Sequence, residues 1–156
     1  MEEKTNVMRM LDQKKIPYRA HYYGAGEALA GIQVAQLLGE DPARVFKTLV
    51  TVGHSRRNYV FVIPVGEELD LKKAARTVGE KAIEMVKSKD LLSLTGYVHG
   101  GCSPIGMKKP FPTTLHESAR AFDAILFSAG RIGAQVEVSP EDLKRMVNYR
   151  FADLIK

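Results

Sequence analysis

Two β-rich runs separated by a short polar turn constrain the fold more than any other feature of this chain. The runs are residues 45–52 (VFKTLVTV) and 58–64 (NYVFVIP), and the five residues between them read GHSRR. Valine, isoleucine, threonine and aromatic residues favour pleated strands, and a short connection that contains glycine is typical of a hairpin. The sequence therefore predicts an antiparallel β-hairpin over residues 45–64.

Several other segments carry helix signals. Apolar residues at helical spacing predict helices over residues 6–15 and 29–38. In the second of these, Ile32, Ala35 and Leu38 are expected to share the buried face. Capping residues and prolines at first-turn positions predict further helical starts. These lie after Asp41-Pro42, at Asp70, at Ser88 or Asp90, and at Ser139-Pro140-Glu141-Asp142.

Short extended runs complete the pattern. They cover residues 18–23, 82–86, 124–128 and 134–138. Helices and strands are mixed without a regular alternation, which favours an α+β fold over a doubly wound parallel sheet. We expect a single compact domain over residues 1–156, with a mixed, mostly antiparallel sheet flanked by helices.

Composition limits the class of protein. A chain of 156 residues with 45% hydrophobic and 26% charged residues is typical of one globular domain. One cysteine cannot form an internal disulfide, and no apolar run approaches the roughly 18 residues of a membrane span. The charged start MEEKTNVMRM lacks a signal-peptide core, so we expect a cytoplasmic protein with no membrane partner. A net charge of +5 favours a partner that carries phosphates.

Residues 96–109, GYVHGGCSPIGMKK, contain four glycines and one proline. Glycine lets a ligand approach the backbone closely, and successive main-chain N–H groups in such turns can converge on an oxyanion or phosphate. The segment fits a pocket wall built from backbone. Taken alone, it fits an ordinary solvated loop equally well.

Lys47 lies inside the first strand of the predicted hairpin, between apolar neighbours. Strand alternation places Lys47 and Leu49 on one face and Phe46 and Thr48 on the other. An ammonium group is costly to bury without a partner, so the side chain either reaches solvent or binds a carbonyl, carboxylate or phosphate oxygen in a pocket.

Three segments together resemble one protein family. VFKTLV, GYVHGGCSPIGMKK and FSAGRIG (127–133) are similar to the motifs of the YbaK/EbsC-like aminoacyl-tRNA deacylases. These are free-standing relatives of the editing domain of bacterial prolyl-tRNA synthetases. The similarity runs in the family's order over nearly the whole chain. It extends to Ile16-Pro17, His21-Tyr22-Tyr23, Leu69-Asp70-Leu71-Lys72-Lys73 and Phe151-Ala152-Asp153.

The resemblance implies a set of site residues. Lys47 matches the family's invariant lysine and is the expected catalytic residue. The expected substrate-binding residues match the aromatic position, the residue after the lysine, the glycine loop and the serine–glycine turn. They are Tyr23, Thr48, Gly100, Gly101, Ser103, Pro104, Ile105, Gly106, Ser128 and Gly130.

The resemblance also implies an activity. Family members hydrolyse the ester of mischarged tRNA, and the YbaK-like branch acts on Cys-tRNA(Pro). In this family the substrate's own thiol attacks its ester carbonyl. We expect the backbone N–H groups around Gly100 and Gly101 to orient the ester, and Lys47 to bind either the tRNA 3′ end or the developing negative charge. The expected partners are aminoacylated tRNA(Pro) and prolyl-tRNA synthetase. No cofactor is expected, and the cysteine and histidines show no paired metal-ligand spacing.

Two alternatives concern the activity itself. The protein could remove another small amino acid, such as alanine, or it could be a non-catalytic module that binds a tRNA 3′ end or a nucleotide. Gln135 stands where some relatives have an acidic residue, and Ala30 where some have phenylalanine. Both differences affect the expected pocket and therefore the preferred amino acid.

Other reactive or basic residues have structural and functional interpretations. Cys102 beside His99 could form a nucleophile pair, although a free cysteine is more often a small buried apolar residue. Lys108 and Lys109 follow the glycine loop and could contact tRNA phosphates. Arg56-Arg57 could also contact phosphates, although a solvated pair is the favoured interpretation for these two residues. The remaining histidines, expected to be structural or exposed, are His21, His54 and His116.

Overall fold

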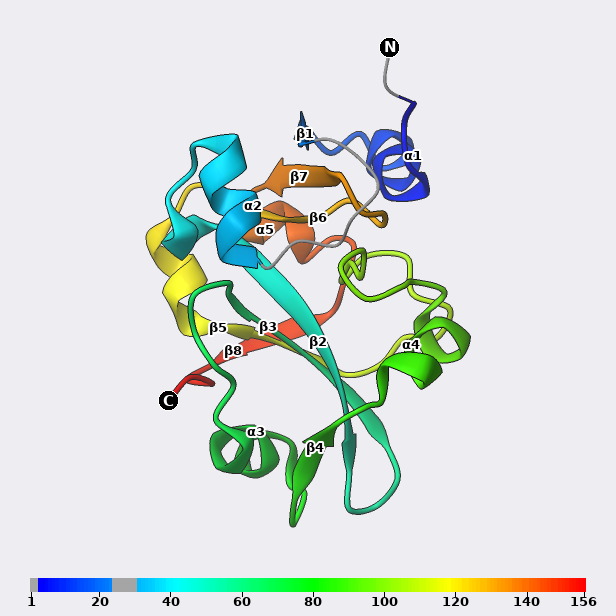
Figure 1. The fold of residues 1–156 in the computed structure, drawn as a ribbon, viewed down its shortest axis with the longest axis vertical. Coiled ribbons are helices and arrows are strands. Elements are labelled where there is room, and N and C mark those ends of the chain that lie inside the picture. Colours follow the sequence, from blue (N-terminus) through cyan, green and yellow to red (C-terminus); the bar gives the residue numbers. More distant parts are fainter. Residues whose placement is uncertain (1–2, 24–30) are drawn as a thin grey trace.

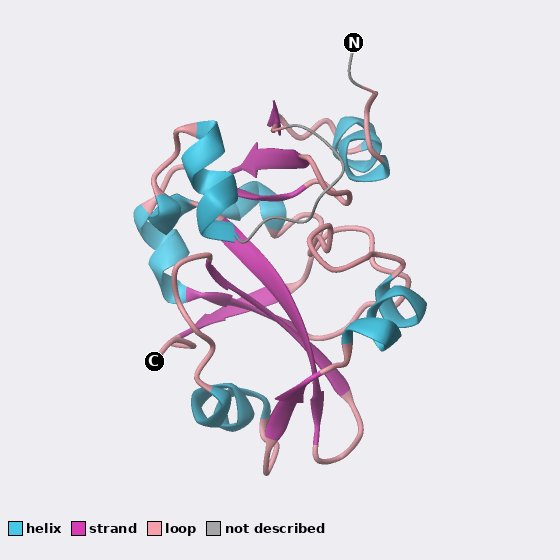
Figure 2. Ribbon diagram, in the orientation of Figure 1, coloured by secondary structure: helices cyan, strands magenta, loops and turns pink. Residues whose placement is uncertain are grey.

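The strands of this protein form two sheets, and helices flank both (Figure 1, Figure 2). The computed structural model describes residues 3–23 and 31–156. In chain order the elements are α1 (Asn6–Gln13), β1 (Arg19–Tyr22), α2 (Gly31–Leu38), the 3-10 turn η1 (Pro42–Arg44), β2 (Phe46–Gly53), β3 (Asn58–Pro64), α3 (Leu71–Val78), β4 (Ile83–Met85), α4 (Ser88–Thr95), β5 (Thr113–His116), the 3-10 turn η2 (Glu117–Ala121), β6 (Ile125–Ser128), β7 (Ala134–Val138), α5 (Pro140–Leu143) and β8 (Tyr149–Ala152).

The larger sheet has five strands in the order β4-β2-β3-β5-β8. β2 and β3 form the predicted antiparallel hairpin, with Phe46 opposite Pro64 and Val52 opposite Asn58. β3 pairs with β5, and β5 with β8, in parallel. The α+β class and the mixed sheet are confirmed.

Strands β5 and β8 were not predicted. Each is only four residues long, so neither shows enough alternation to be recognised without its partner. Tertiary pairing with the hairpin extends these segments, and it introduces the parallel half of the sheet.

The smaller sheet has three antiparallel strands in the order β1-β7-β6. A parallel bridge between Val45 and Leu126 connects its edge to the start of β2. The two sheets therefore meet where β2 begins, and Figure 1 shows β2 running from this junction towards β4.

Side-chain alternation along the hairpin separates two apolar cores. Phe46 and Val50 face the larger core, which also contains Val7 of α1 and Phe127 and Val136 of the small sheet. On the other face, Leu49 packs with Phe61 and Ile63 against the two buried alanines of α3, Ala74 and Ala75. The predicted alternation along β2 is confirmed.

The predicted caps at Asp41, Asp70 and Ser139 form, whereas α4 begins at Ser88 without a side-chain cap. Asp70 accepts hydrogen bonds from the backbone N–H groups of Lys72 and Lys73, and the Ser139 hydroxyl accepts one from Asp142. Each bond satisfies a backbone donor that has no partner within its helix. Among the described residues, no helix has the length and apolar character needed to cross a membrane.

The buried face predicted for α2 is partly wrong. Ala35 is buried, but Val34 takes the place expected for Ile32, whose side chain is 38% exposed. The helix packs Ala35 against Val45 and Leu126, near the junction of the two sheets, which turns Ile32 towards a cavity. Residues 29 and 30 of the predicted helix lie outside the described residues.

Candidate active site

A cavity of about 800 Å³ lies along the first half of β2. Its walls come from segments far apart in the sequence. They are contributed by Tyr23, by Gly31, Ile32 and Val34, by residues 45–50, by Val65 and Gly66, by Met85, Val86, Ser88 and Leu91, by His99, Gly100 and Cys102, and by Ser128 and Gln135.

The floor of the cavity is an exposed strand edge. The Val45 carbonyl accepts a hydrogen bond from Val65 on the β3 side, whereas the Val50 carbonyl accepts one from Val86 on the opposite side. Because backbone groups alternate in direction along an antiparallel strand, those of Thr48 point away from β3, as those of Val50 do. Within residues 3–23 and 31–156, this edge meets no other strand between the Leu126 bridge and the Val86 contact.

Lys47 lines this cavity from the face of β2 that it shares with Leu49. Burial lowers the pKa of its ammonium group below the ordinary value, and the nearby carboxylates of Glu68 and Glu67 partly oppose this shift. In the part of the chain that the structure describes, Lys47 forms no ion pair within 4.0 Å. Its charge is therefore available to a ligand oxygen.

Thr48, Ser128 and Gln135 contribute polar side chains to the cavity. Ser128 and Gln135 are directly opposite each other in the β6–β7 pair. Gln135 is 7% exposed, and within residues 3–23 and 31–156 its Oε1 atom has no hydrogen-bond partner. The same holds for the buried Oγ1 atom of Thr48. A buried polar atom without a partner carries a desolvation cost that a ligand donor can remove.

The glycine loop contributes His99, Gly100 and Cys102 to the wall. Gly100 has a φ of 88°, a conformation that favours glycine. A Cβ atom on Gly101 would lie 3.1 Å from the Arg131 Cα, so the loop packs directly on the β6–β7 turn. The Gly101 N–H already donates to the Val98 carbonyl at 3.0 Å. Of the two backbone donors predicted to orient an ester, Gly101 is therefore engaged within the loop.

The second half of the loop turns away from this cavity. Ser103 and Ile105 are fully buried, and the Ser103 hydroxyl accepts a hydrogen bond from the Ile105 N–H at 3.3 Å. Pro104 and Gly106 line a separate cavity of about 710 Å³. The structure thus places these four predicted residues behind the wall, where they support the loop.

Three other predicted contact residues, Gly130, Lys108 and Lys109, do not line this cavity. Gly130 has a φ of 99° and donates its N–H to the Ser128 hydroxyl at 3.1 Å, which shapes the β6–β7 turn. Lys109 lines the separate cavity, and the side chain of Lys108 lies beside Gly96. Neither lysine lines the cavity that contains Lys47.

Cys102 is not suited to act as a nucleophile. Burial raises the pKa of its thiol to about 12, although a hydrogen bond with Thr95 acts in the opposite direction. The thiolate is the reactive form of cysteine, so it is almost absent at neutral pH. The structure therefore favours the interpretation of Cys102 as a small buried side chain of the wall.

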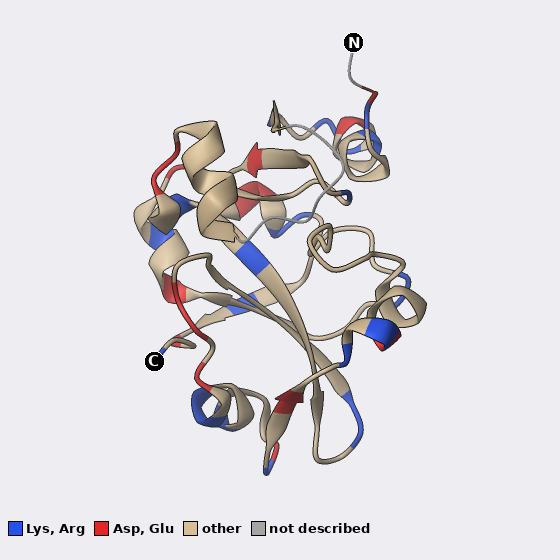
Figure 3. Ribbon diagram, in the orientation of Figure 1, with Lys and Arg blue, Asp and Glu red and all other residues tan. Residues whose placement is uncertain are grey.

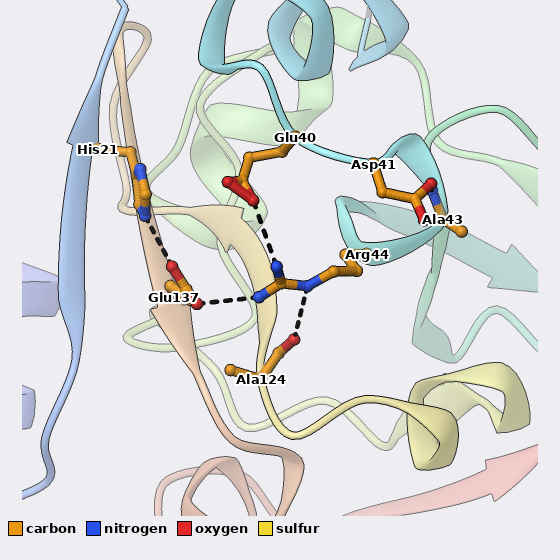
Figure 4. A network of polar contacts seen from close by, with 7 residues as sticks. All are labelled: His21, Glu40, Asp41, Ala43, Arg44, Ala124 and Glu137. Atoms are coloured by element: carbon orange, nitrogen blue, oxygen red, sulfur yellow. Dashed lines mark hydrogen bonds and ion pairs between the residues drawn. The ribbon is translucent and has the colours of Figure 1, made fainter.

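His21 belongs to an ionic network that fixes the small sheet beside the cavity (Figure 4). Its Nε2 atom and the Glu137 Oε1 atom are 2.9 Å apart, and Arg44 of η1 reaches the other Glu137 oxygen at 2.9 Å. Arg44 also contacts Glu40 and donates to the Ala124 carbonyl, both at 3.3 Å. The network joins β1, η1 and β7, and so holds the strand that leads into Tyr23.

The other two histidines also have the expected structural or exposed positions. His116 is buried, and its Nδ1 atom accepts a hydrogen bond from the Leu154 N–H, while His54 is exposed. Among the described residues, no group of three histidine, cysteine, aspartate or glutamate side chains could hold a metal ion.

Sequence reasoning did not identify the wall formed by Met85, Val86, Ser88 and Leu91. No local signal marks these residues, because they reach the cavity only through the pairing of β4 with the far end of β2. The position of Gln135 opposite Ser128 could have been found by pairing the two extended runs predicted over residues 124–128 and 134–138 as neighbouring antiparallel strands.

Comparisons with known proteins converge on one family. The aminoacyl-tRNA editing domain matches residues 27–146. A protein of Enterococcus faecalis named Cys-tRNA(Pro)/Cys-tRNA(Cys) deacylase EbsC is 49% identical over 154 residues, which is 98% of this chain and 94% of that protein.

Solved structures share the fold at lower identity. A crystal structure described as that of a trans-editing enzyme for prolyl-tRNA synthetase is 24% identical, with a TM-score of 0.84 and coverage of 99% of both chains. The hypothetical protein APE2540 is 20% identical, with a TM-score of 0.88 and coverage of 97% of this chain and 100% of that one.

Proposed function

Because the chain belongs to the aminoacyl-tRNA editing domain family, we propose that it acts in trans as a deacylase that removes cysteine from wrongly charged tRNA(Pro). The name of the relative from Enterococcus faecalis supports this substrate class. The observation that carries the proposal is the cavity itself. It combines the ammonium group of Lys47 with two buried oxygens, those of Thr48 and Gln135, and none of the three has a partner in the part of the chain that the structure describes.

The size of the cavity fits an aminoacyl ester together with the end of its nucleic acid. A volume of about 800 Å³ lies in the upper part of the range of small-molecule sites. The polar atoms of Ser128, Gln135 and Thr48 suit the amino acid, because an α-ammonium group donates hydrogen bonds to such acceptors.

The residues suit intramolecular attack by the substrate thiol. In this step the cysteine sulfur forms a bond to its own ester carbonyl carbon, the carbon–oxygen bond to ribose breaks, and the thiol proton passes to the ribose oxygen. Water then opens the released thiolactone to cysteine. The protein supplies orientation, which is worth up to about 7–11 kcal/mol, and charge stabilisation worth roughly 3–4 kcal/mol for each well-placed donor. Lys47 and the Gly100 N–H are the donors that we assign to this task.

The state of the protein's own nucleophiles supports a reaction driven by the substrate. Cys102 is held as the thiol because burial raises its pKa to about 12. Ser103 is fully buried behind the wall, and the Ser128 hydroxyl accepts a hydrogen bond from Gly130. None of the three is activated by a base among the residues that the structure describes.

The test is single-turnover loss of amino acid from Cys-tRNA(Pro) and Ala-tRNA(Pro). Wild type should release cysteine rapidly and alanine slowly, and Lys47→Ala should lower the cysteine rate by about 100-fold, the scale of one lost charge-stabilising donor. Lys72→Ala, which removes an exposed lysine of α3, is the matched control and should retain the rate. Faster loss of alanine would overturn the thiol mechanism, and folded wild type without turnover of either ester would overturn the deacylase assignment for these substrates.

Gln135→Met tests the amino-acid end of the cavity. The Gln135 oxygen has no partner among the residues that the structure describes, so its removal should leave the free energy of unfolding unchanged or raise it. Deacylation should slow, because the substrate amino group loses an acceptor. Unchanged deacylation kinetics would refute the assignment of Gln135 to the substrate.

We propose prolyl-tRNA synthetase as the partner that selects the tRNA. A chain of 156 residues whose cavity accommodates an aminoacyl end has little surface for reading a whole tRNA. Addition of the synthetase should therefore accelerate deacylation of Cys-tRNA(Pro) more than that of Cys-tRNA(Cys). Equal rates with and without the synthetase would refute the partnership.

A further inference from the structure

The junction of β4 and α4 forms the wall at one end of the cavity. Met85, Val86 and Ser88 line the cavity, and the side chain of Met85 is 45% exposed, so it can contact a ligand. Lys87 and Lys89 flank Ser88 and are both exposed. We call residues 85–89 the β4–α4 wall.

The second feature of this wall is its pair of exposed lysines. In the described part of the chain, neither Lys87 nor Lys89 makes an ion pair, whereas Lys73 is paired with Asp153 and Lys4 with Asp12. Basic and acidic positions occur together near the start of α4 (Figure 3), and the acidic residue of the first turn is Asp90.

The geometry of β2 gives the cavity a direction. The strand starts at the small sheet, where the Val45–Leu126 bridge lies close to the polar wall of Ser128 and Gln135. It reaches the β4–α4 wall where Val50 accepts the Val86 N–H. Five residues of strand separate these points by about 17 Å. A ligand with its amino acid at the polar wall therefore extends along the strand edge towards residues 85–89.

We propose that the β4–α4 wall binds the single-stranded 3′ end of the tRNA, with Met85 packing against a base and Lys87 and Lys89 contacting phosphates. This inference rests on the proposed function, which supplies the ester that sits at the other end. It assigns the phosphate contacts to Lys87 and Lys89, which flank the cavity-lining Ser88. Lys109 instead lines the separate cavity, and the side chain of Lys108 lies beside Gly96.

Salt dependence measures the lysine contacts directly. Each phosphate neutralised on a single strand contributes about −0.7 to the slope of log K against log salt concentration. Loss of two contacts should therefore reduce the magnitude of the slope by about 1.4. A packing contact from Met85 should change affinity without changing this slope.

The experiment is fluorescence anisotropy with a labelled RNA hairpin that carries a short single-stranded 3′ tail ending in CCA, over about 50 to 200 mM salt. The double variant Lys87→Gln/Lys89→Gln should bind more weakly and lose about 1.4 from the slope. The control variant Arg56→Gln/Arg57→Gln also removes two positive charges, here at the tip of the β2–β3 hairpin. These arginines line neither of the two cavities described above, so this variant should keep the wild-type slope. Met85→Ala should weaken binding of the tailed hairpin only.

Two results would overturn the inference. One is an equal slope of log K against log salt concentration for wild type and for Lys87→Gln/Lys89→Gln. The other is an equally large change of this slope when the RNA hairpin lacks the single-stranded tail. Deacylation by wild type is measured separately, so the two proposals can fail independently. If wild type deacylates the tRNA but the double variant keeps the wild-type salt slope, residues 85–89 do not bind the RNA. If the slope changes as predicted but wild type shows no deacylation, the RNA contact is supported and the deacylase assignment is overturned.

Discussion

Gly101→Ala tests whether the close packing of the glycine loop sets the geometry of the site. The new Cβ atom would lie 3.1 Å from the Arg131 Cα, 3.1 Å from the Ile132 nitrogen and 3.2 Å from the Arg131 carbonyl carbon. Ordinary van der Waals contact begins at 3.4 Å, and all three atoms belong to backbone that cannot rotate away. The loop must therefore move from the β6–β7 turn by a few tenths of an ångström.

This displacement has an expected cost in stability and in rate. Overpacking of this kind costs about 1–3 kcal/mol of unfolding free energy. The adjacent Gly100 lines the cavity and moves with the loop. A misplacement of 1 Å can cost about 100-fold in rate, so a few tenths of an ångström should slow deacylation roughly three- to tenfold.

Urea unfolding and single-turnover deacylation at saturating protein measure the two effects. Gly79→Ala is the matched control, since Gly79 has a φ of +78° and its added Cβ would meet no heavy atom within 4 Å. That variant should lose about 1–2 kcal/mol through backbone strain alone and keep the wild-type rate. If Gly101→Ala is as stable and active as wild type, or if both variants lose rate equally, the packing argument is wrong.

Three further predictions follow from the titratable groups. Burial raises the pKa of the Cys102 thiol to about 12, so an alkylating reagent at neutral pH should modify the folded protein at least 100-fold more slowly than the urea-unfolded chain, and rapid labelling of the folded protein would contradict this. Burial lowers the pKa of His116, whose Nδ1 atom accepts a hydrogen bond from the Leu154 N–H. The unfolded chain therefore binds the proton more tightly than the folded protein. The free energy of unfolding should be constant above about pH 6.5 and should fall as the pH drops towards the pKa of folded His116. Urea titrations should show a weaker pH dependence for His116→Gln, and an unchanged dependence would refute its role. The pKa of Lys47 should lie below 10.5 when followed by NMR of ¹³C-methylated lysines, and Glu68→Gln should lower it further because an opposing carboxylate is lost; a normal titration would refute its burial.

The parts of the fold that depend on local chemistry could be predicted from the sequence. The β2–β3 hairpin follows from β-branched runs and a glycine turn, and Asp70 and Ser139 cap their helices because their oxygens reach backbone donors two or three residues away. The alternation that separates Lys47 from Thr48 also follows from strand geometry alone.

The parts that depend on tertiary assembly could not. β5 and β8 are too short to show a pattern, and they become strands through parallel pairing with β3 and with each other. Ser103 and Ile105 belong to the predicted glycine motif, yet the loop turns their side chains into the core. The direction in which a loop side chain points depends on what packs beneath it, which sequence spacing does not record.

One edge of β2 meets no other strand around Thr48 among the described residues, and this has a consequence for self-association. An apolar strand with unpaired backbone groups is a template on which another chain can add a strand and begin to aggregate. Here the edge around Thr48 lies at the floor of a cavity whose walls include the glycine loop and Ile32 of α2. Walls around a strand edge hinder the approach of a continuous neighbouring strand. The walls that shape the cavity therefore also protect the protein from self-association.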